Sequence, residues 1–289
     1  MTDGFAIRET VVTGIGAVRD GGDPTPFVRL RKLRKFMGRQ DDLAVVAAGR
    51  ALASASLAAP LGERCGLFLT VGYIPFETED IDRLLEASLD DERFSMARFA
   101  ANAFGAINPL LTFRVLPNMP AFHVSLNFDI QGPYAVSYPG IGQFYTVLEE
   151  AWAALESGAI DVALVGGVAD QRNFLVEHHF SRLDPPVDAA RLANVGAFLT
   201  IERAVDARAR GAAVRARLTD YGLTYAPVEP FTATTPAEWV SCQGVCGSDA
   251  LHAGPASLAL TLSETAAGRV IHRARTRDGF TAESTWEIA

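Results

Sequence analysis

One stretch in the middle of the chain constrains the fold more than any other. A short apolar segment, expected to be a buried strand, runs into the turn Tyr-Pro-Gly-Ile-Gly-Gln at residues 138–143. A helix is expected over residues 141–157, with Trp152 on its apolar face and Gly158 as its C-cap. Residues 161–168 follow as an apolar strand. Two strands and a helix within about forty residues predict a parallel pair joined by a right-handed crossover, and hence a layered α/β fold whose sheet is buried on both faces.

The rest of the chain continues this alternation of strands and helices. We expect further strands over residues 10–16, 65–71, 194–203 and 214–221, helices over residues 41–57, 76–89, 204–211 and 253–267, and an irregular helical stretch over residues 108–127. Residues 270–275 and 280–288 form a hairpin around Asp278-Gly279. No linker is visible, so we expect one domain over residues 1–289.

Composition excludes several classes of protein. The 289 residues are 49% hydrophobic and 21% charged, with no apolar run near the roughly 18 residues of a membrane span and no secretory signal at the start. The cysteines Cys65, Cys242 and Cys246 are too few for a disulfide framework. We therefore expect a cytoplasmic protein without a membrane helix.

The net charge of −8 argues against nucleic-acid binding, because neutralising phosphates needs a basic surface. Positive charge is nevertheless concentrated in one place, the basic segment Arg29, Arg31, Lys32, Arg34 and Lys35, which Arg39 follows. This segment either attracts an acidic protein partner or is a solvated face that leads into the next helix.

No cofactor or metal is expected. Gly14-Ile15-Gly16 lacks the third glycine of a dinucleotide-binding fingerprint. Cys242 and Cys246 are four residues apart without a second pair, and Glu177-His178-His179 fits a polar loop better than a metal site.

Taken in order, these segments resemble the β-ketoacyl synthases of fatty-acid and polyketide assembly. Residues 10–16 resemble the first strand of that family, and residues 132–167 resemble its active-site elbow, helix and glycine-paired strand, with Gly-Pro at 132–133 and Gly166-Gly167 at family-like spacing. The resemblance implies a thiolase-like fold of layered α-β-α-β-α architecture. It covers the first half well, to about residue 221, whereas residues 222–289 are an abbreviated second half.

The same resemblance indicates that the catalytic groups are missing. The family's nucleophilic cysteine falls on Ile141, and chain-length factors, the inactive partners of ketosynthases, often have glutamine there, whereas here Gln143 is two positions later. Phe231 stands where the first family histidine would be, and Gly247 replaces the lysine. His252 matches the second histidine, although a capping or packing role is the more common use of such a residue. We interpret Ile141, Phe231 and His252 as vestigial positions with no catalytic role.

The resemblance therefore implies a noncatalytic, chain-length-factor-like subunit that pairs with an active ketosynthase and helps to shape its acyl tunnel. The basic segment would then dock an acyl carrier protein. Two alternatives stay open: an active condensing or acyl-transfer enzyme that uses Cys246 and His252, and a homo-oligomeric acyl-binding protein. The residues expected to line the tunnel are Phe113, Met119, Phe122, Ile141, Gln143 and Phe144.

Overall fold

The computed structural model describes residues 9–183, 186–226, 239–243, 252–276 and 279–289. Within these ranges one mixed sheet of nine strands has the order β5-β2-β6-β7-β1-β8-β11-β10-β9. Its strands are β1 (Thr10–Arg19), β2 (Cys65–Val71), β5 (Tyr134–Ser137), β6 (Val162–Ala169), β7 (Val195–Arg203), β8 (Ala216–Tyr225), β9 (Trp239–Gln243), β10 (Gly268–Arg275) and β11 (Phe280–Ile288). A separate small hairpin consists of β3 (Leu89–Asp90) and β4 (Arg93–Phe94).

Helices cover the sheet and connect its strands. The α-helices are α2 (Arg39–Ser54), α3 (Thr78–Ser88), α4 (Met96–Arg98), α5 (Phe104–Ala106), α6 (Leu111–Val115), α7 (Met119–Phe128), α8 (Ile141–Glu156), α9 (Phe174–Ser181), α10 (Ala204–Ala209) and α11 (Ser257–Glu264). Short turns of other helix types are η1 (Thr25–Phe27), η2 (Arg31–Phe36), η3 (Phe99–Ala103), η4 (Ala189–Arg191) and η5 (Gly254–Ala256). In the described ranges no helix has the length and hydrophobicity needed to cross a bilayer.

The strands on either side of α8 are parallel, as expected, but they are not neighbours. β2 lies between β5 and β6 and pairs in parallel with both. β5 is therefore the edge strand of the sheet, and its residues are exposed or half-buried. The expectation of a buried strand before the turn is wrong, because no described strand of the chain pairs with the outer side of β5.

The alternation of side chains along β2 defines two apolar layers. Leu67 and Leu69 belong to the cluster formed with α2 and α7 on one face of the sheet. Phe68 points to the opposite face and joins the cluster formed with α8 and α11. Consecutive strand residues point to opposite faces, so β2, which is buried at every residue, is covered on both sides.

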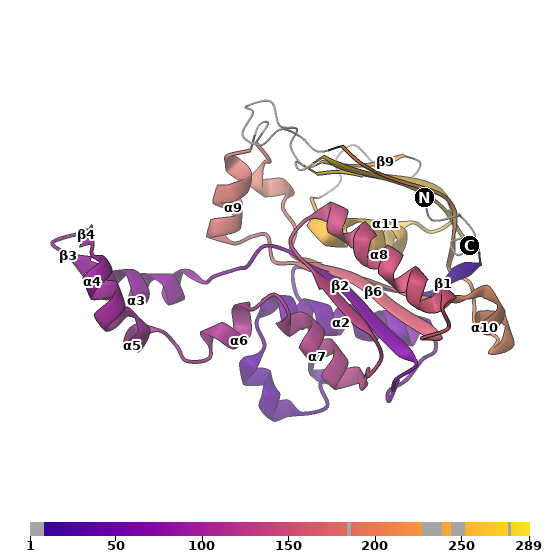
Figure 1. The fold of residues 1–289 in the computed structure, drawn as a ribbon, viewed down its shortest axis with the longest axis horizontal. Helices are drawn as coiled ribbons and strands as arrows, with labels where there is room; N and C mark the ends of the chain where they lie inside the picture. Colours follow the sequence, from indigo (N-terminus) through magenta and orange to yellow (C-terminus); the bar gives the residue numbers. More distant parts are fainter. Residues whose placement is uncertain (1–8, 184–185, 227–238, 244–251, 277–278) are drawn as a thin grey trace.

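The C-terminal part of the sheet curves over α8 and α11 (Figure 1). Val270 on β10 and Ala282 and Trp286 on β11 belong to the same buried cluster as α8 and α11. The layers therefore run helix, sheet, helix, sheet, which follows the expected α-β-α-β-α order except that the described residues form no last helical layer. Along β10, buried residues alternate with half-buried ones, so the outer face of this last layer is partly open, in keeping with an abbreviated second half.

Two features differ from the sequence-based expectations or extend them. Residues 177–179, expected in a polar loop, lie within α9. Residues 78–106 form an arm, built from α3, β3, β4, α4, η3 and α5, that projects away from the layered body (Figure 1). Phe231, Cys246 and Gly247 lie outside the described residues.

Candidate active-site elbow

The elbow is the turn from β5 into α8. Gly140 is the N-cap of α8 and Ile141 is the first residue of the helix, with only 1% of its surface exposed. The Ile141 side chain packs in the same apolar cluster as Phe144. An apolar, water-excluded alkyl group therefore occupies the position where the family resemblance places the nucleophile.

The C-terminal hairpin packs directly on the first turn of α8. A Cβ atom added to Gly142 would lie 2.7 Å from Cγ2 of Thr276 and 2.8 Å from Cδ1 of Phe280. Real carbon atoms do not approach this closely, so the space beside Gly142 is smaller than a methyl group. This side of the elbow is filled by protein.

The polar groups of the elbow hold it together. The Ser137 hydroxyl lies 2.7 Å from the Thr70 hydroxyl on β2 and donates to the backbone oxygen of Gln143 at 3.3 Å. It links the edge strand to β2 and to α8, which is a structural role. The side-chain oxygen of Gln143 is buried without a hydrogen-bond partner.

His252 has the wrong proton arrangement for stabilising an oxyanion. The side-chain NH₂ of Gln171 donates to the backbone oxygens of Ala193, at 3.0 Å, and of His252, at 2.5 Å. Its oxygen therefore accepts from Nδ1–H of His252 at 3.2 Å. Burial lowers the pKa of His252 to about 4, so the ring is neutral and Nε2 carries no proton. An oxyanion needs a donor, and the buried Nε2 atom is an acceptor without a partner.

The structure places the expected tunnel residues in two groups. Ile141, Gln143 and Phe144 lie on α8, on one side of the sheet. Met119 and Phe122 lie on α7, on the opposite side, where Met119 is buried and Phe122 is exposed. Phe113 on α6 is also exposed, with its ring against Phe36. The structure therefore does not bring the six together in one cavity.

The basic segment lies mostly on η2 and is largely exposed. Arg34 is hydrogen-bonded to Asp42, and Arg29 lies 3.8 Å from Asp129. Arg31 and Lys32 are exposed on the same short helix. Their charge is available to an acidic partner.

Sequence reasoning missed two buried polar clusters. The first joins Tyr145 on α8 by hydrogen bonds to Ser257, His272 and Ser284 of the second half. The second surrounds Asp170, directly after β6, and Gln40, in the first turn of α2. The sequence signal for this second cluster is Asp170, a charged residue that directly follows an apolar strand. Among the described residues no cluster of three or more His, Cys, Asp or Glu side chains is suited to a metal ion.

Comparisons with known proteins identify the fold. A chain of the AntDE:AntF complex, a type II PKS acyl-carrier protein with its ketosynthase bound to the hexaketide, matches with a TM-score of 0.70 at 13% identity over 98% of this chain and 100% of that one. A β-ketoacyl synthase from Burkholderia phymatum STM815 matches with a TM-score of 0.66 at 16% identity over 98% and 100% of the two chains. The ishigamide ketosynthase/chain length factor matches with a TM-score of 0.55 at 24% identity, over 75% of this chain and 64% of that one. The chain has the thiolase-like ketosynthase fold.

No curated protein matches the sequence. The family described as "Beta-ketoacyl synthase, N-terminal domain" matches residues 8–189, which is more than half of the chain. That segment includes the elbow, β2, β6 and α8. With this match and the shared fold, the chain belongs to the β-ketoacyl synthase family.

Proposed function

We propose that this chain is a noncatalytic ketosynthase-like subunit, similar to a chain-length factor, that pairs with an active ketosynthase in type II polyketide or fatty-acid-type chain assembly. The observation that carries the proposal is the buried Ile141 at the start of α8. An alkyl side chain neither attacks a thioester nor transfers a proton. The unprotonated Nε2 of His252 also supports a noncatalytic role, because it has no proton to donate to an oxyanion.

The edge of the sheet supports pairing with a second chain. Leu67 N–H donates to the backbone oxygen of Pro133 at 3.0 Å, and a parallel ladder uses alternate residues of each strand. The backbone groups of Tyr134 and Val136 therefore face away from β2. The Tyr134 side chain is 73% exposed, and Tyr138, just after the strand, is also exposed. An open strand edge with exposed aromatic side chains is suited to β-pairing with a partner.

The arm at residues 78–106 is a second candidate contact surface. Leu85, Leu89, Phe94 and Met96 are large apolar residues of the arm that are exposed. Exposed apolar groups on a projecting element are usually covered by another chain. We place an active ketosynthase there, in line with the ketosynthase/chain length factor among the structural neighbours.

The acyl carrier protein is the proposed second partner, in the cytoplasm. One structural neighbour is a complex of an acyl-carrier protein with its ketosynthase. The basic segment offers the complementary charge. Ile141 and Phe144 are fully buried on α8, and we propose that they limit the acyl tunnel by filling the elbow rather than by lining an open channel.

The test is co-expression with a ketosynthase encoded beside this chain, followed by size-exclusion chromatography with light scattering. We expect a one-to-one complex whose turnover of malonyl- and acyl-carrier substrates is lost when the partner's cysteine is replaced by alanine. The isolated chain should be inactive. Turnover by the isolated chain that disappears in His252→Ala or Cys246→Ala would contradict the proposal, and a stable homodimer that retains an acyl ligand would favour the acyl-binding alternative.

A further inference from the structure

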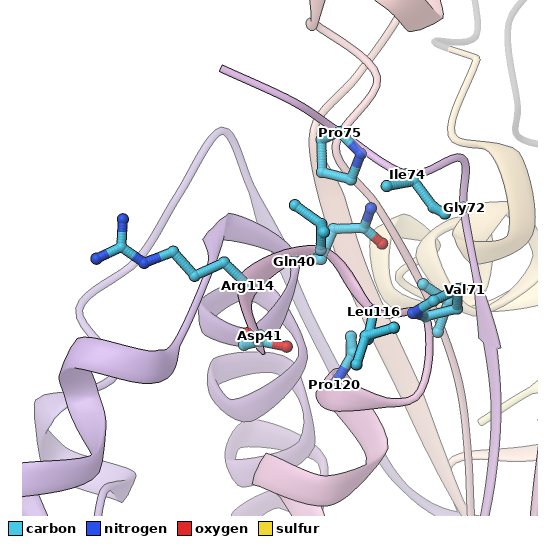
Figure 2. A pocket seen from close by; sticks show the side chains of 11 residues that line it. Gln40, Asp41, Val71, Gly72, Ile74, Pro75, Arg114, Leu116 and Pro120 are labelled. Atoms are coloured by element: carbon cyan, nitrogen blue, oxygen red, sulfur yellow. The ribbon is translucent and has the colours of Figure 1, made fainter. Parts of the chain in front are cut away.

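A polar cleft lies at the carboxyl ends of β2 and β6, beside the start of α2. Its wider part encloses about 260 Å³. A narrow inner part of about 10 Å³ shares Pro75, Arg114 and Val115 with it (Figure 2). The carboxyl ends of parallel strands are the usual ligand-binding edge of an α/β sheet. The volume of the wider part is just below the roughly 300 Å³ of typical ligand pockets, so the occupant must be a small molecule.

Three buried acceptor atoms line this cleft without a hydrogen bond, and Oδ1 of Asp41 is one of them. Nε of Arg114, which also lines the cleft, is a buried donor without a partner. The other two acceptors belong to Asp170 and Gln40. Asp170 is 2% exposed, and its Oδ1 atom has no hydrogen-bond partner; Nη1 of Arg39 lies 3.7 Å away. Gln40 is 5% exposed, and its Nε2 donates to the backbone oxygen of Tyr73 at 2.8 Å, while its Oε1 has no partner. Buried oxygens are normally paired, so both atoms call for a ligand that donates hydrogen bonds.

The charges around the cleft favour a cation. Four acids line the wider part, Asp42, Glu77, Asp80 and Asp170, against Arg39 and Arg114, and of these acids Asp42 is already paired with Arg34. Burial raises the pKa of Asp170 to about 6, Arg39 opposes that shift, and the nearby charge of Glu77 adds to it. Carboxylates that crowd one another in this way are stabilised by a positive group placed between them.

The two arginines do not fill this role. Arg39 is mostly exposed and only approaches Asp170. The Arg114 side chain donates to the backbone oxygen of Lys35 at 3.3 Å, and Figure 2 shows its guanidinium directed away from Gln40. Asp42 lies in the first turn of α2 and offsets the positive end of that helix, whereas burial raises the pKa of Asp41 well above its ordinary value.

The spacing of the acids favours an organic cation over a metal ion. No three carboxylate, imidazole or thiol groups of the described residues converge closely enough to hold one metal ion. An ammonium or guanidinium group, in contrast, needs only one ion-pair partner and can place further donors toward separate acceptors.

We propose that the polar cleft binds the ammonium or guanidinium group of a small organic cation, with Asp170 as its ion-pair partner and the side-chain oxygen of Gln40 as an acceptor at the inner end. Glu77 and Asp80 add long-range attraction at the mouth. The site is independent of the proposed subunit role, and either one can fail without the other.

The test is a titration of the full chain with n-butylamine and n-butylguanidinium, followed by amide chemical shifts in NMR. We expect saturable shifts at residues 39–42, 72–80 and 170, and none with 1-butanol or butyrate at equal concentration. Asp170→Asn should weaken amine binding at least about tenfold, as expected for a lost buried ion-pair partner. The control is Asp220→Asn, which removes one negative charge from an exposed position on β8. It should leave amine affinity unchanged.

Three results would overturn the proposal. The first is that no saturable shifts occur at any amine concentration at which the protein stays folded. The second is that 1-butanol binds as tightly as n-butylamine. The third is that Asp170→Asn and Asp220→Asn weaken amine binding equally. If Asp170→Asn does not fold, Glu77→Gln, at an exposed residue of the cleft mouth, provides the comparison. Its amine affinity should then fall while its thermal unfolding stays unchanged, and an unchanged affinity would count against the site.

Discussion

The Tyr145 hydroxyl on α8 lies 2.6 Å from Nδ1 of His272 on β10, and both side chains are fully buried. The same hydroxyl lies 3.0 Å from Oγ of Ser284 on β11, and Nε2 of His272 lies 3.1 Å from Oγ of Ser257 at the start of α11. Helix α8 of the first half is thus joined to three elements of the second half, α11, β10 and β11, by one chain of hydrogen bonds. Removing any member leaves buried polar neighbours unpaired.

Tyr145→Phe should therefore destabilise the fold. The ring stays, but His272 and Ser284 lose a partner in a water-free environment, which costs about 1–3 kcal/mol. Urea unfolding measures the loss. Tyr225→Phe is the matched control, because Tyr225 is exposed on β8 and its change should stay within about 0.5 kcal/mol. Equal effects of the two substitutions would show that the network contributes nothing.

His272 should make the fold sensitive to mild acid. Burial lowers its pKa to about 3 from an ordinary 6.5, so below pH 6.5 the unfolded chain binds a proton that the folded chain does not. Stability is therefore lost as pH falls, by about 2 kcal/mol between pH 7 and pH 5 for this group alone. His272→Gln should reduce the pH dependence of the unfolding free energy by that amount, whereas His178→Gln, at an exposed residue of α9, should leave it unchanged. An unaltered pH dependence in His272→Gln would contradict the assignment.

A cysteine placed at the elbow should stay unreactive. In Ile141→Cys the thiol would be enclosed by the apolar cluster of α8, and burial without a basic neighbour raises a thiol pKa. We expect iodoacetamide to label this thiol at least about a hundredfold more slowly than the thiol of Tyr134→Cys on the exposed edge strand. A thiol pKa about two units higher, or burial that blocks the reagent to the same extent, would give this ratio. Condensation activity should not appear. Rapid labelling of Ile141→Cys would mean that an open pocket exists at the elbow.

The edge strand offers a way to separate pairing from folding. The backbone N–H of Val136 faces away from β2, so Val136→Pro removes an outward donor and no bond of the β2–β5 ladder. Because the half-buried Val136 side chain packs on the cluster of α2 and α7, we expect a loss of about 1–2 kcal/mol in unfolding free energy, while the one-to-one complex with the ketosynthase is lost in light scattering. Ala135→Pro, whose N–H belongs to the ladder, should lower stability further. Complex formation by Val136→Pro at wild-type affinity would remove β5 from the interface.

Reversing charge in the basic segment should weaken carrier-protein binding. Arg31→Glu combined with Lys32→Glu changes two exposed groups and avoids Arg34, which is hydrogen-bonded to Asp42. We expect a loss of at least about tenfold in affinity at low salt, shrinking as ionic strength rises. Arg217→Glu with Arg269→Glu, at exposed positions of β8 and β10, gives the same charge change as a control. Equal losses in both double variants would indicate an effect of net charge alone.

Local patterns predicted the individual elements well. The strand expected over residues 65–71 is β2 with the same bounds, and the helix expected over residues 141–157 is α8, ending one residue earlier. The C-terminal hairpin is confirmed as β10 and β11. In each case the periodicity of apolar residues within one segment determines the structure.

Relations between distant segments were not predictable in the same way. The insertion of β2 between β5 and β6 depends on long-range pairing, which no local pattern records. The edge position of β5, and hence its exposure, follows from that order. The polar cleft joins Gln40, Arg114 and Asp170 from three separate elements, so the periodicity of any one of them contains no sign of a site.

The length of β5 sets a limit on how this protein can associate. The strand has four residues, and only the backbone groups of Tyr134 and Val136 face its open side. The open edge is therefore short and accepts only a short partner strand. A longer strand would find no further residues of β5 to pair with at either end. Such an edge allows this chain to pair with one partner strand in a single register, and it disfavours the open-ended edge-to-edge pairing that leads to fibres.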